Sequence, residues 1–143
     1  MTQTYSDDFI RDILSETKTV ALVGYSEKPE RASNKVANFL ADKGYRVIAV
    51  NPGLAGQAFR GEPIVGSLAE IPEGEPVDMV DIFRRSEAVG PVVDAALAHL
   101  SGLKTVWMQV GIENAEAQAA AEAKGVKVVQ DRCPKIEHPR LIG

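Results

Sequence analysis

Five short apolar runs, separated by segments with helical spacing, constrain the fold of this chain more than any other feature of its sequence. In chain order they are TVALVG (19–24), YRVIAV (45–50), VDMVDIF (77–83), TVWMQV (105–110) and VKVVQ (126–130). Most are continuously apolar and rich in valine, which is typical of strands that are covered on both faces. Strands that alternate with helices predict an α/β fold built on an open, mostly parallel sheet of five strands.

Four further segments have the pattern of amphipathic or alanine-rich helices. They are Ser6–Glu16 and the segments 33–44, 89–100 and 113–125. Pro91 lies inside the third pattern, so we expect that helix to begin at Gly90-Pro91, with proline at its first position. In the long break between residues 53 and 76, Ser67 and Glu70 have capping-box spacing and predict one short helix.

The composition is that of an ordinary globular protein, with 45% hydrophobic and 25% charged residues among 143. We expect one domain over residues 1–143. A formal net charge of −4 argues against nucleic acid as a partner, because a polyphosphate backbone needs a broad basic surface. The start of the chain lacks a signal-peptide pattern, and no apolar run approaches the ~20 residues of a membrane span. We therefore expect a cytoplasmic protein with no membrane partner.

The residues that follow each run are candidates for a site, because open parallel sheets bind ligands beyond the carboxyl ends of their strands. The first run continues into GYSEKPERASN, where a dinucleotide-binding loop would read G-x-G-x-x-G. Only Gly24 is present, with Ser26 and Pro29 at the other two glycine positions. The second run ends in Asn51 and Pro52, where NAD enzymes usually have an acid that binds the ribose. Both departures disfavour a standard NAD or FAD site.

The first loop nevertheless has the composition of an anion site. We expect it to end with Ser33 or Asn34 as a helix cap, and a helix start attracts anions through its free N–H groups. Hydroxyl groups and positive charge are supplied by Ser26, Lys28, Arg31, Ser33 and Lys35. The alternative is a solvated loop in which Glu27 and Glu30 neutralise the basic residues.

Later strand ends add hydrogen-bond donors, cations and an apolar ring. After the third run, Phe83 can pack on a ligand ring, and Arg84 or Arg85 can bind a phosphate. After the fourth run, Gln109 and Gly111 offer an amide and backbone groups. This collection is rich in donors and poor in catalytic groups, so it indicates binding of a large anionic molecule without chemistry.

The chain resembles a known family in four segments that occur in matching order. The small stand-alone CoA-binding proteins have similar segments to VALVGYSEKPERASNKVANFLADKGYRVIAVNP, VDMVDIFRRSEAV, VWMQVGI and VVQDRCPKIEH. That family is similar to the CoA-binding domain of the succinyl-CoA synthetase α subunit. The resemblance covers about Ile13 to Leu141 and implies a Rossmann-like, doubly wound sheet with helices on both faces. It also implies CoA, or acyl-CoA, across the carboxyl ends of the strands.

The resemblance also assigns roles to residues by motif. It implies phosphate contacts at the first loop and the following helix N-terminus, from Gly24, Tyr25, Ser26, Arg31, Ser33 and Asn34, beside the cation Lys28. It implies that Asn51, Pro52, Phe83 and Arg84 flank the nucleotide end of CoA, and that Gln109, Val110 and Gly111 lie near the pantetheine arm. The matching segments include neither the phosphorylated histidine of the synthetase nor its nucleotide-binding partner, so ligase chemistry is not implied.

The predicted function is therefore non-catalytic binding of CoA or acyl-CoA, with no metal and no catalytic residue. One alternative is an NAD(P)-binding oxidoreductase or redox-sensing domain on the same fold. Another gives the single cysteine, Cys133, a role as acyl-transfer nucleophile or as the partner of CoA in a mixed disulfide. The nucleophile would need a base, for which only His138 is near in sequence, and a packing role for Cys133 is favoured. A protein partner or a homodimer is left open.

Overall fold

The computed structural model describes residues 4–143, and its centre is a sheet of five parallel strands in the order β2-β1-β5-β6-β7. The strands are β1 (Thr19–Val23), β2 (Arg46–Val50), β5 (Met79–Ile82), β6 (Thr105–Met108) and β7 (Lys127–Val129). The sheet begins with β1. The chain then adds β2 on one side of it and returns to the other side of β1 to add β5, β6 and β7. The strand order therefore reverses between β1 and β5, which is where doubly wound sheets bind their ligands.

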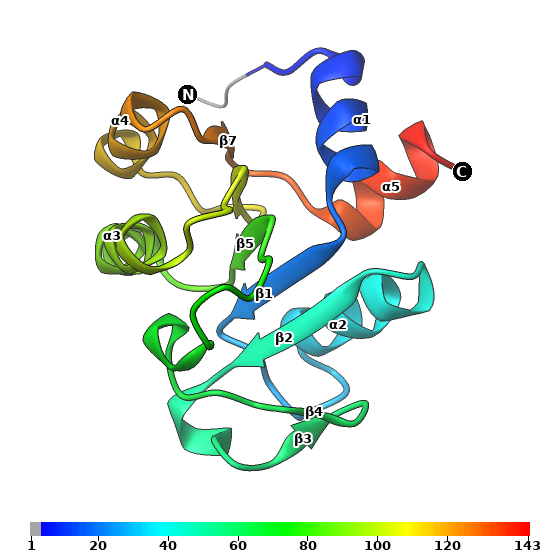
Figure 1. Cartoon of the computed structure of the whole chain (residues 1–143). Helices are drawn as coiled ribbons and strands as arrows, with labels where there is room; N and C mark the ends of the chain where they lie inside the picture. The colour runs from blue at the N-terminus through cyan, green and yellow to red at the C-terminus, as the bar shows by residue number, and fades with distance from the viewer. Residues whose placement is uncertain (1–3) are drawn as a thin grey trace.

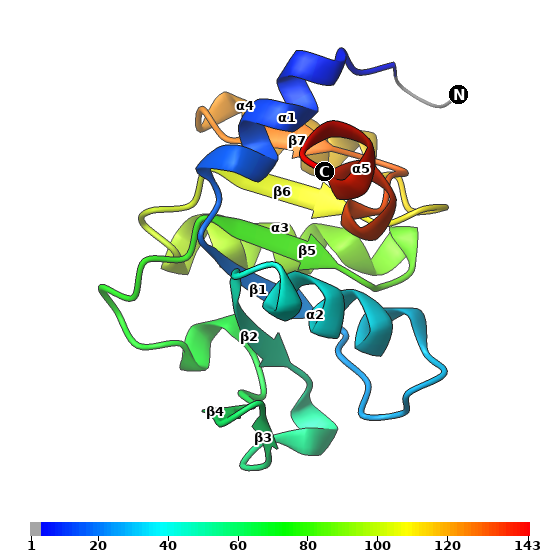
Figure 2. The same ribbon diagram turned by 90° about the vertical axis from the view of Figure 1, so that its right-hand side faces the viewer.

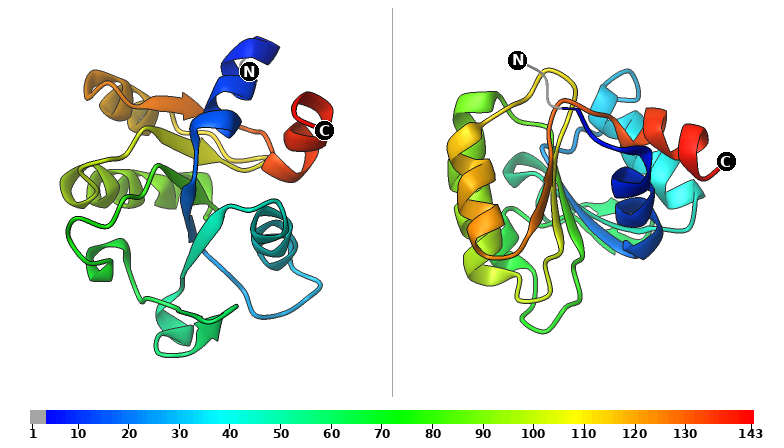
Figure 3. Two further views of the ribbon diagram at one scale, coloured as in Figure 1. Left: turned by 45° about the vertical axis from the view of Figure 1, so that its right-hand side comes forward. Right: turned by 90° about the horizontal axis from the view of Figure 1, so that it is seen from above.

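Helices cover both faces of this sheet. They are α1 (Asp7–Glu16), α2 (Ala32–Asp42), α3 (Val89–His99), α4 (Ala115–Ala123) and α5 (Pro134–Leu141). Helices α3 and α4 lie side by side on one face, and α1, α2 and α5 lie on the other, as Figure 1 and the right-hand view of Figure 3 show. This confirms the predicted Rossmann-like α/β fold and explains why the strand sequences are apolar at almost every position. Within residues 4–143, no helix has the length and apolar character needed to cross a membrane.

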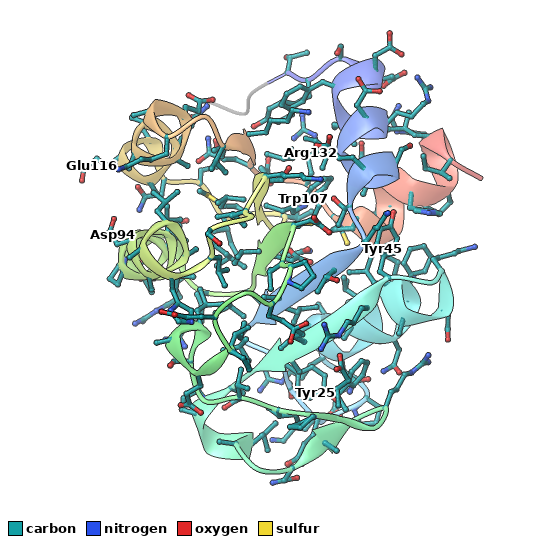
Figure 4. The ribbon with its side chains drawn as sticks, viewed as in Figure 1. Tyr25, Tyr45, Asp94, Trp107, Glu116 and Arg132 are labelled. Atoms are coloured by element: carbon teal, nitrogen blue, oxygen red, sulfur yellow. The ribbon has the colours of Figure 1, made fainter. Side chains whose placement is uncertain are left out.

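Two apolar cores form, one on each face of the sheet. On β5, Val80 and Ile82 belong to the core beneath α3 and α4, whereas Met79 belongs to the core beneath α1, α2 and α5. Because side chains alternate along a strand, Asp81 faces the same layer as Met79. Trp107, which is fully buried in that layer, donates from Nε1 to the carbonyl oxygen of Arg132 at 2.9 Å (Figure 4).

The segment between β2 and β5 extends the fold beyond the edge of the sheet. It contains the 3₁₀ turns η1 (Pro52–Leu54) and η2 (Leu68–Glu70) and a two-stranded antiparallel hairpin, β3 (Ala58–Phe59) with β4 (Glu62–Pro63). Figure 2 shows this hairpin below β2, apart from the helices. The predicted short helix is therefore present at η2. Its predicted capping box is wrong in detail, because Ser67 makes no capping bond and Glu70 Oε1 instead accepts from the Gly66 N–H at 3.1 Å.

Two helix starts differ from the predictions. Helix α2 begins at Ala32 with Arg31 as its N-cap, so Ser33 and Asn34 lie inside its first turn and neither is the cap. The Ser33 side chain is buried there, and the Asn34 amide bonds to the preceding loop. Helix α3 begins at Val89, because the 3₁₀ turn η3 (Ser86–Ala88) leads directly into it. Pro91 is thus the third helical residue, still within the first turn, where its missing N–H costs no bond.

Candidate functional site

A continuous groove runs along the carboxyl edge of the sheet, and we call it the edge groove. It consists of three pockets, named the η2 pocket (about 360 Å³), the loop pocket (about 340 Å³) and the β6 pocket (about 520 Å³). Gly24 and Asn51 line both the η2 pocket and the loop pocket. Ala32 and Phe83 line both the loop pocket and the β6 pocket. The shared walls make the three pockets one binding surface at the point where the strand order reverses.

The loop after β1 is fixed to β2 and to the β3–β4 hairpin. The N–H groups of Gly24 and Tyr25 both donate to the carbonyl oxygen of Val50, at 3.0 and 3.2 Å. The Tyr25 ring is buried and meets Phe59 edge-on, with 5.2 Å between ring centroids, and Figure 4 shows Tyr25 beneath β2. Burial raises the pKa of the Tyr25 phenol above its ordinary value, so this group stays neutral. The loop is therefore preorganised.

Two asparagine side chains brace the same loop from either side. The Asn34 amide donates to the carbonyl oxygen of Ser26 at 3.0 Å. The Asn51 amide donates to the carbonyl oxygen of Tyr25 at 2.6 Å, and its Oδ1 accepts from the Gly53 N–H at 2.7 Å. Asn34 does not line the edge groove, whereas Asn51 does. Both amides thus act on the shape of the loop, and the Ser26 side chain remains at the wall of the loop pocket.

The start of α2 forms the polar wall of the loop pocket. Arg31, the N-cap residue, makes no side-chain capping bond, so the first N–H groups of the helix have no acceptor among the described residues. Ala32 and Ser33 line the pocket at this helix start. Lys28 and Arg31 also line it, and neither forms an ion pair within the described chain. Free N–H groups at the positive end of a helix, beside two cations, make a site for an anion.

The ends of β5 and β6 supply the remaining predicted residues. Phe83 separates the loop pocket from the β6 pocket, and Arg84 lines both the η2 pocket and the β6 pocket. Gln109 and Val110 line the β6 pocket. Gly111 does not, because it forms a tight turn with φ of +85° in which its N–H donates to Asp131 at 2.6 Å. Pro52 lies in the wall of the η2 pocket.

The structure brings into the groove several residues that the CoA site predicted from the sequence did not include. The floor of the η2 pocket comes from η2 and α3, through Ser67, Leu68, Ala69, Pro91, Val92 and Ala95. Cys133 is partly buried and lines the β6 pocket together with Ile136 of α5. Asp81 lies buried behind this wall, and an aspartate inside the apolar run VDMVDIF was the signal that could have identified it.

The charge distribution of the groove has one sign. Its walls contain Lys28, Arg31, Arg84 and Arg85, of which Arg85 forms an ion pair with Glu87, and no aspartate or glutamate of the described residues lines any of the three pockets. Among residues 4–143, no three or more His, Cys, Asp and Glu side chains come together as a metal site would require. His138 lies outside the groove lining, against the rings of Phe39 and Tyr45. The edge groove is suited to a molecule with several negative charges.

Comparison with known proteins identifies the family. The family described as the CoA binding domain matches residues 18–139, a range that contains every strand of the central sheet and all residues of the edge groove. The chain belongs to the CoA-binding domain family. The resemblance stated from the sequence motifs is thereby confirmed at the level of the family. A curated relative, the uncharacterized protein YneT of Bacillus subtilis (strain 168), is 38% identical over 129 residues, which cover 90% of this chain and 91% of YneT.

Solved structures agree with this assignment. A hypothetical protein from Pyrococcus horikoshii OT3 is similar over 100% of both chains, with 36% sequence identity and a TM-score of 0.87. A dinucleotide-forming acetyl-coenzyme A synthetase 1 from Ca. Korarchaeum cryptofilum is similar over 86% of this chain and 27% of that enzyme, with a TM-score of 0.65 and 21% identity. The second likeness concerns the fold alone. In that enzyme the fold forms part of a longer chain.

Proposed function

We propose that this member of the CoA-binding domain family binds CoA or an acyl-CoA along the edge groove and performs no chemistry on it. The observation that carries the proposal is the order of surfaces in the groove, where the polar, cation-lined loop pocket lies between two apolar pockets. CoA has the same order of parts, because its pyrophosphate separates an adenine nucleotide from a pantetheine arm. Family membership supports CoA as the ligand.

In this proposal the pyrophosphate binds at the start of α2. The free N–H groups of the first helical turn donate to it, and Lys28 and Arg31 neutralise its charge. The adenine nucleotide occupies the η2 pocket, where Pro52 and Leu68 offer apolar surface. Arg84, at the boundary of the η2 and β6 pockets, is available to the 3′-phosphate. The pantetheine arm follows Phe83 into the β6 pocket.

The absence of acidic residues from the groove lining favours CoA over NAD. An NAD site usually has an acid at the end of the second strand that binds the ribose hydroxyls, and this chain has Asn51 there, whose amide already binds the first loop. A groove lined by four basic residues and no acid suits the additional 3′-phosphate of CoA.

The proposal of binding without catalysis is based on the groups near the expected thioester. Cys133 is the nucleophile that lines the β6 pocket, and no histidine or carboxylate lines that pocket as a base. Incubation of the protein with acetyl-CoA, with free thiol measured over time, is expected to give no release above the buffer rate. Hydrolysis that disappears in a Cys133→Ala variant would establish catalysis instead.

Isothermal titration calorimetry with CoA, 3′-dephospho-CoA and NAD tests the ligand. We expect CoA to bind best, 3′-dephospho-CoA to bind more weakly because it lacks one phosphate, and NAD to give little or no heat. Clear binding of NAD together with no heat from CoA would exclude the proposal.

A further inference from the structure

Asp81 is a buried acid that the proposed ligand contacts above do not use. It is the third residue of β5, it has no exposed surface, and its neighbours across the sheet are Leu22 and Trp107. Within residues 4–143 its carboxyl group has one hydrogen-bond partner, the side-chain amide of Gln109. One amide atom of Gln109 lies 2.9 Å from Oδ1 and 3.2 Å from Oδ2 of Asp81. A fully buried aspartate whose carboxyl group bonds to a single side-chain amide is unusual.

The charge state of Asp81 determines which end of the Gln109 amide faces it. An ionised carboxylate only accepts hydrogen bonds and would face the amide nitrogen, whereas a neutral carboxyl group can donate its O–H to the amide oxygen. Burial raises the pKa of Asp81 well above its ordinary value of 3.8, and no charged side chain offsets this effect. A carboxylate without a cation in an apolar layer is costly, so the neutral form is favoured.

Gln109 connects this buried acid to the edge groove. Its backbone N–H donates to the carbonyl oxygen of Ile82 at 3.4 Å, and its own carbonyl oxygen accepts from the Ile112 N–H at 2.9 Å, so its backbone is held by the end of β5 and by the turn that follows β6. The residue is 6% exposed and lines the β6 pocket. When Oε1 accepts from neutral Asp81, Nε2 is the end of the amide that remains for the groove. Its side chain makes no other hydrogen bond within the described chain.

We propose that neutral Asp81 is a positioning residue that holds Gln109 with its amide N–H toward the β6 pocket, where it donates to a carbonyl oxygen of the pantetheine arm or of a thioester. This inference rests on the proposed binding of CoA. The pantetheine arm contains two amide carbonyls. Apart from Gln109, Arg84 and Arg85, the β6 pocket is lined largely by apolar side chains, among them Phe83, Val110, Ile112 and Ile136. A carbonyl that enters such a pocket needs a donor there, because an unpaired polar group is costly to bury.

Two ligands separate this role from a general structural one. CoA contains the pantetheine arm, whereas adenosine 3′,5′-bisphosphate keeps much of the nucleotide end and lacks the arm. In calorimetric titrations we expect Gln109→Leu to weaken CoA binding roughly five- to tenfold and to change bisphosphate binding less than about twofold. Gln109→Met, which has a similar length and no N–H, should weaken CoA binding to a similar degree. Met79→Leu, on the same face of β5 and also buried, is the matched control and should bind both ligands as the wild type does.

The Asp81 variants test the positioning step. Asp81→Leu removes the bond to Gln109 and should reproduce the selective loss of CoA affinity, while Asp81→Asn, whose N–H can replace the carboxyl O–H, should restore most of it. Retained affinity in Gln109→Met, or equal losses for CoA and the bisphosphate in Gln109→Leu, would overturn the inference. If Asp81→Leu does not fold, the two Gln109 variants and the Asn variant still decide the question.

An NMR measurement without ligand keeps this inference distinct from the proposed function. The side-chain carboxyl carbon of Asp81, assigned by its loss in Asp81→Asn, should have the chemical shift of a protonated acid at pH 7. The Gln109 side-chain amide signal should then move on addition of CoA and not on addition of the bisphosphate. An ionised Asp81 would refute the positioning step even if CoA binds, whereas a neutral Asp81 in a protein that binds no CoA would refute only the ligand.

Discussion

The backbone of Gly24 lies against that of Phe83, so closely that a Cβ atom added to Gly24 would lie 2.4 Å from the carbonyl oxygen of Phe83. Gly24 also has φ of +91°, a conformation that side chains with a Cβ rarely adopt. The ends of β1 and β5 thus meet through a residue without a side chain. This contact brings the loop after β1 and Phe83 together in the wall of the loop pocket.

A Gly24→Ala substitution tests this contact. We expect it to reduce the free energy of unfolding by roughly 1–3 kcal/mol, from the strained backbone, with the clash adding to the loss. Urea denaturation measures the effect. Gly44→Ala is the matched control, because Gly44 has φ of +96° and a Cβ atom added there would have no neighbouring atom within 4 Å. An equal loss of stability in both variants would show that the approach of Phe83 costs nothing.

Removal of the cations at the start of α2 should weaken ligand binding without affecting the fold. We expect Arg31→Ala and Lys28→Ala each to reduce CoA affinity by roughly three- to tenfold, because each loses a charge-assisted contact with phosphate. Lys18→Ala makes the same change in net charge at the opposite edge of the sheet and should leave the dissociation constant unaffected. Calorimetry at two salt concentrations checks that the loss is electrostatic, because the CoA affinity of each variant should fall less with added salt than that of the wild type. An equal fall in the variants and the wild type would contradict this prediction.

The buried acid predicts a specific dependence of stability on pH. Because the pKa of Asp81 is raised in the folded protein, the native state keeps a proton that the unfolded chain releases. The contribution of Asp81 to stability is therefore complete below about pH 4 and decreases as the pH rises toward the folded-state pKa. Asp81→Asn should remove this pH dependence, so the free energy of unfolding of the variant should rise relative to that of the wild type between about pH 4 and pH 7. A constant difference across that range would show that Asp81 is ionised in the fold.

From His138 we expect the opposite dependence of stability on pH. Burial, and then the charge of Lys43, lower its pKa below 6.5, and its Nδ1 has no hydrogen-bond partner in the structure. As the pH falls through about 6.5, His138 takes up a proton in the unfolded chain but stays neutral in the folded protein, so the free energy of unfolding decreases. His138→Phe keeps an aromatic ring beside Phe39 and Tyr45 and removes the titration. Urea titrations should show that the free energy of unfolding decreases less between pH 7 and pH 5 in the variant than in the wild type. Identical decreases would contradict this prediction.

The sequence predicted the strands and most helices well because their patterns are local. The apolar runs identified every strand of the central sheet, and Ser6 caps α1 as expected, with the Phe9 N–H donating to its Oγ at 3.1 Å. Helix starts were less predictable. Arg31 is the N-cap of α2 even though serine is a better capping residue, and Ser33 instead lies buried inside the first turn of the helix. Tertiary burial here outweighs local capping preference.

The candidate site was predictable where residues directly follow a strand and not where distant segments meet. Gly24, Pro52 and Phe83 follow strands and line the edge groove. The floor of the η2 pocket comes from η2 and α3, whose approach depends on the path of the whole segment between β2 and β5. The bracing role of Asn34 and the pairing of Asp81 with Gln109 are likewise contacts between different elements. No pattern within one segment specifies them.

The most direct test of the central claim is a ¹H–¹⁵N NMR titration with CoA. If CoA lies along the edge groove with its pyrophosphate at the start of α2, the largest changes should occur at the amides of Gly24–Ser26, Ala32–Asn34 and Phe83–Arg84. The amides of Lys18 and Gly125, at the opposite edge of the sheet, should remain unchanged. Saturable changes confined to the carboxyl edge would support the account. Binding of CoA that leaves the Ala32–Asn34 amides unmoved, or no binding at all, would contradict it.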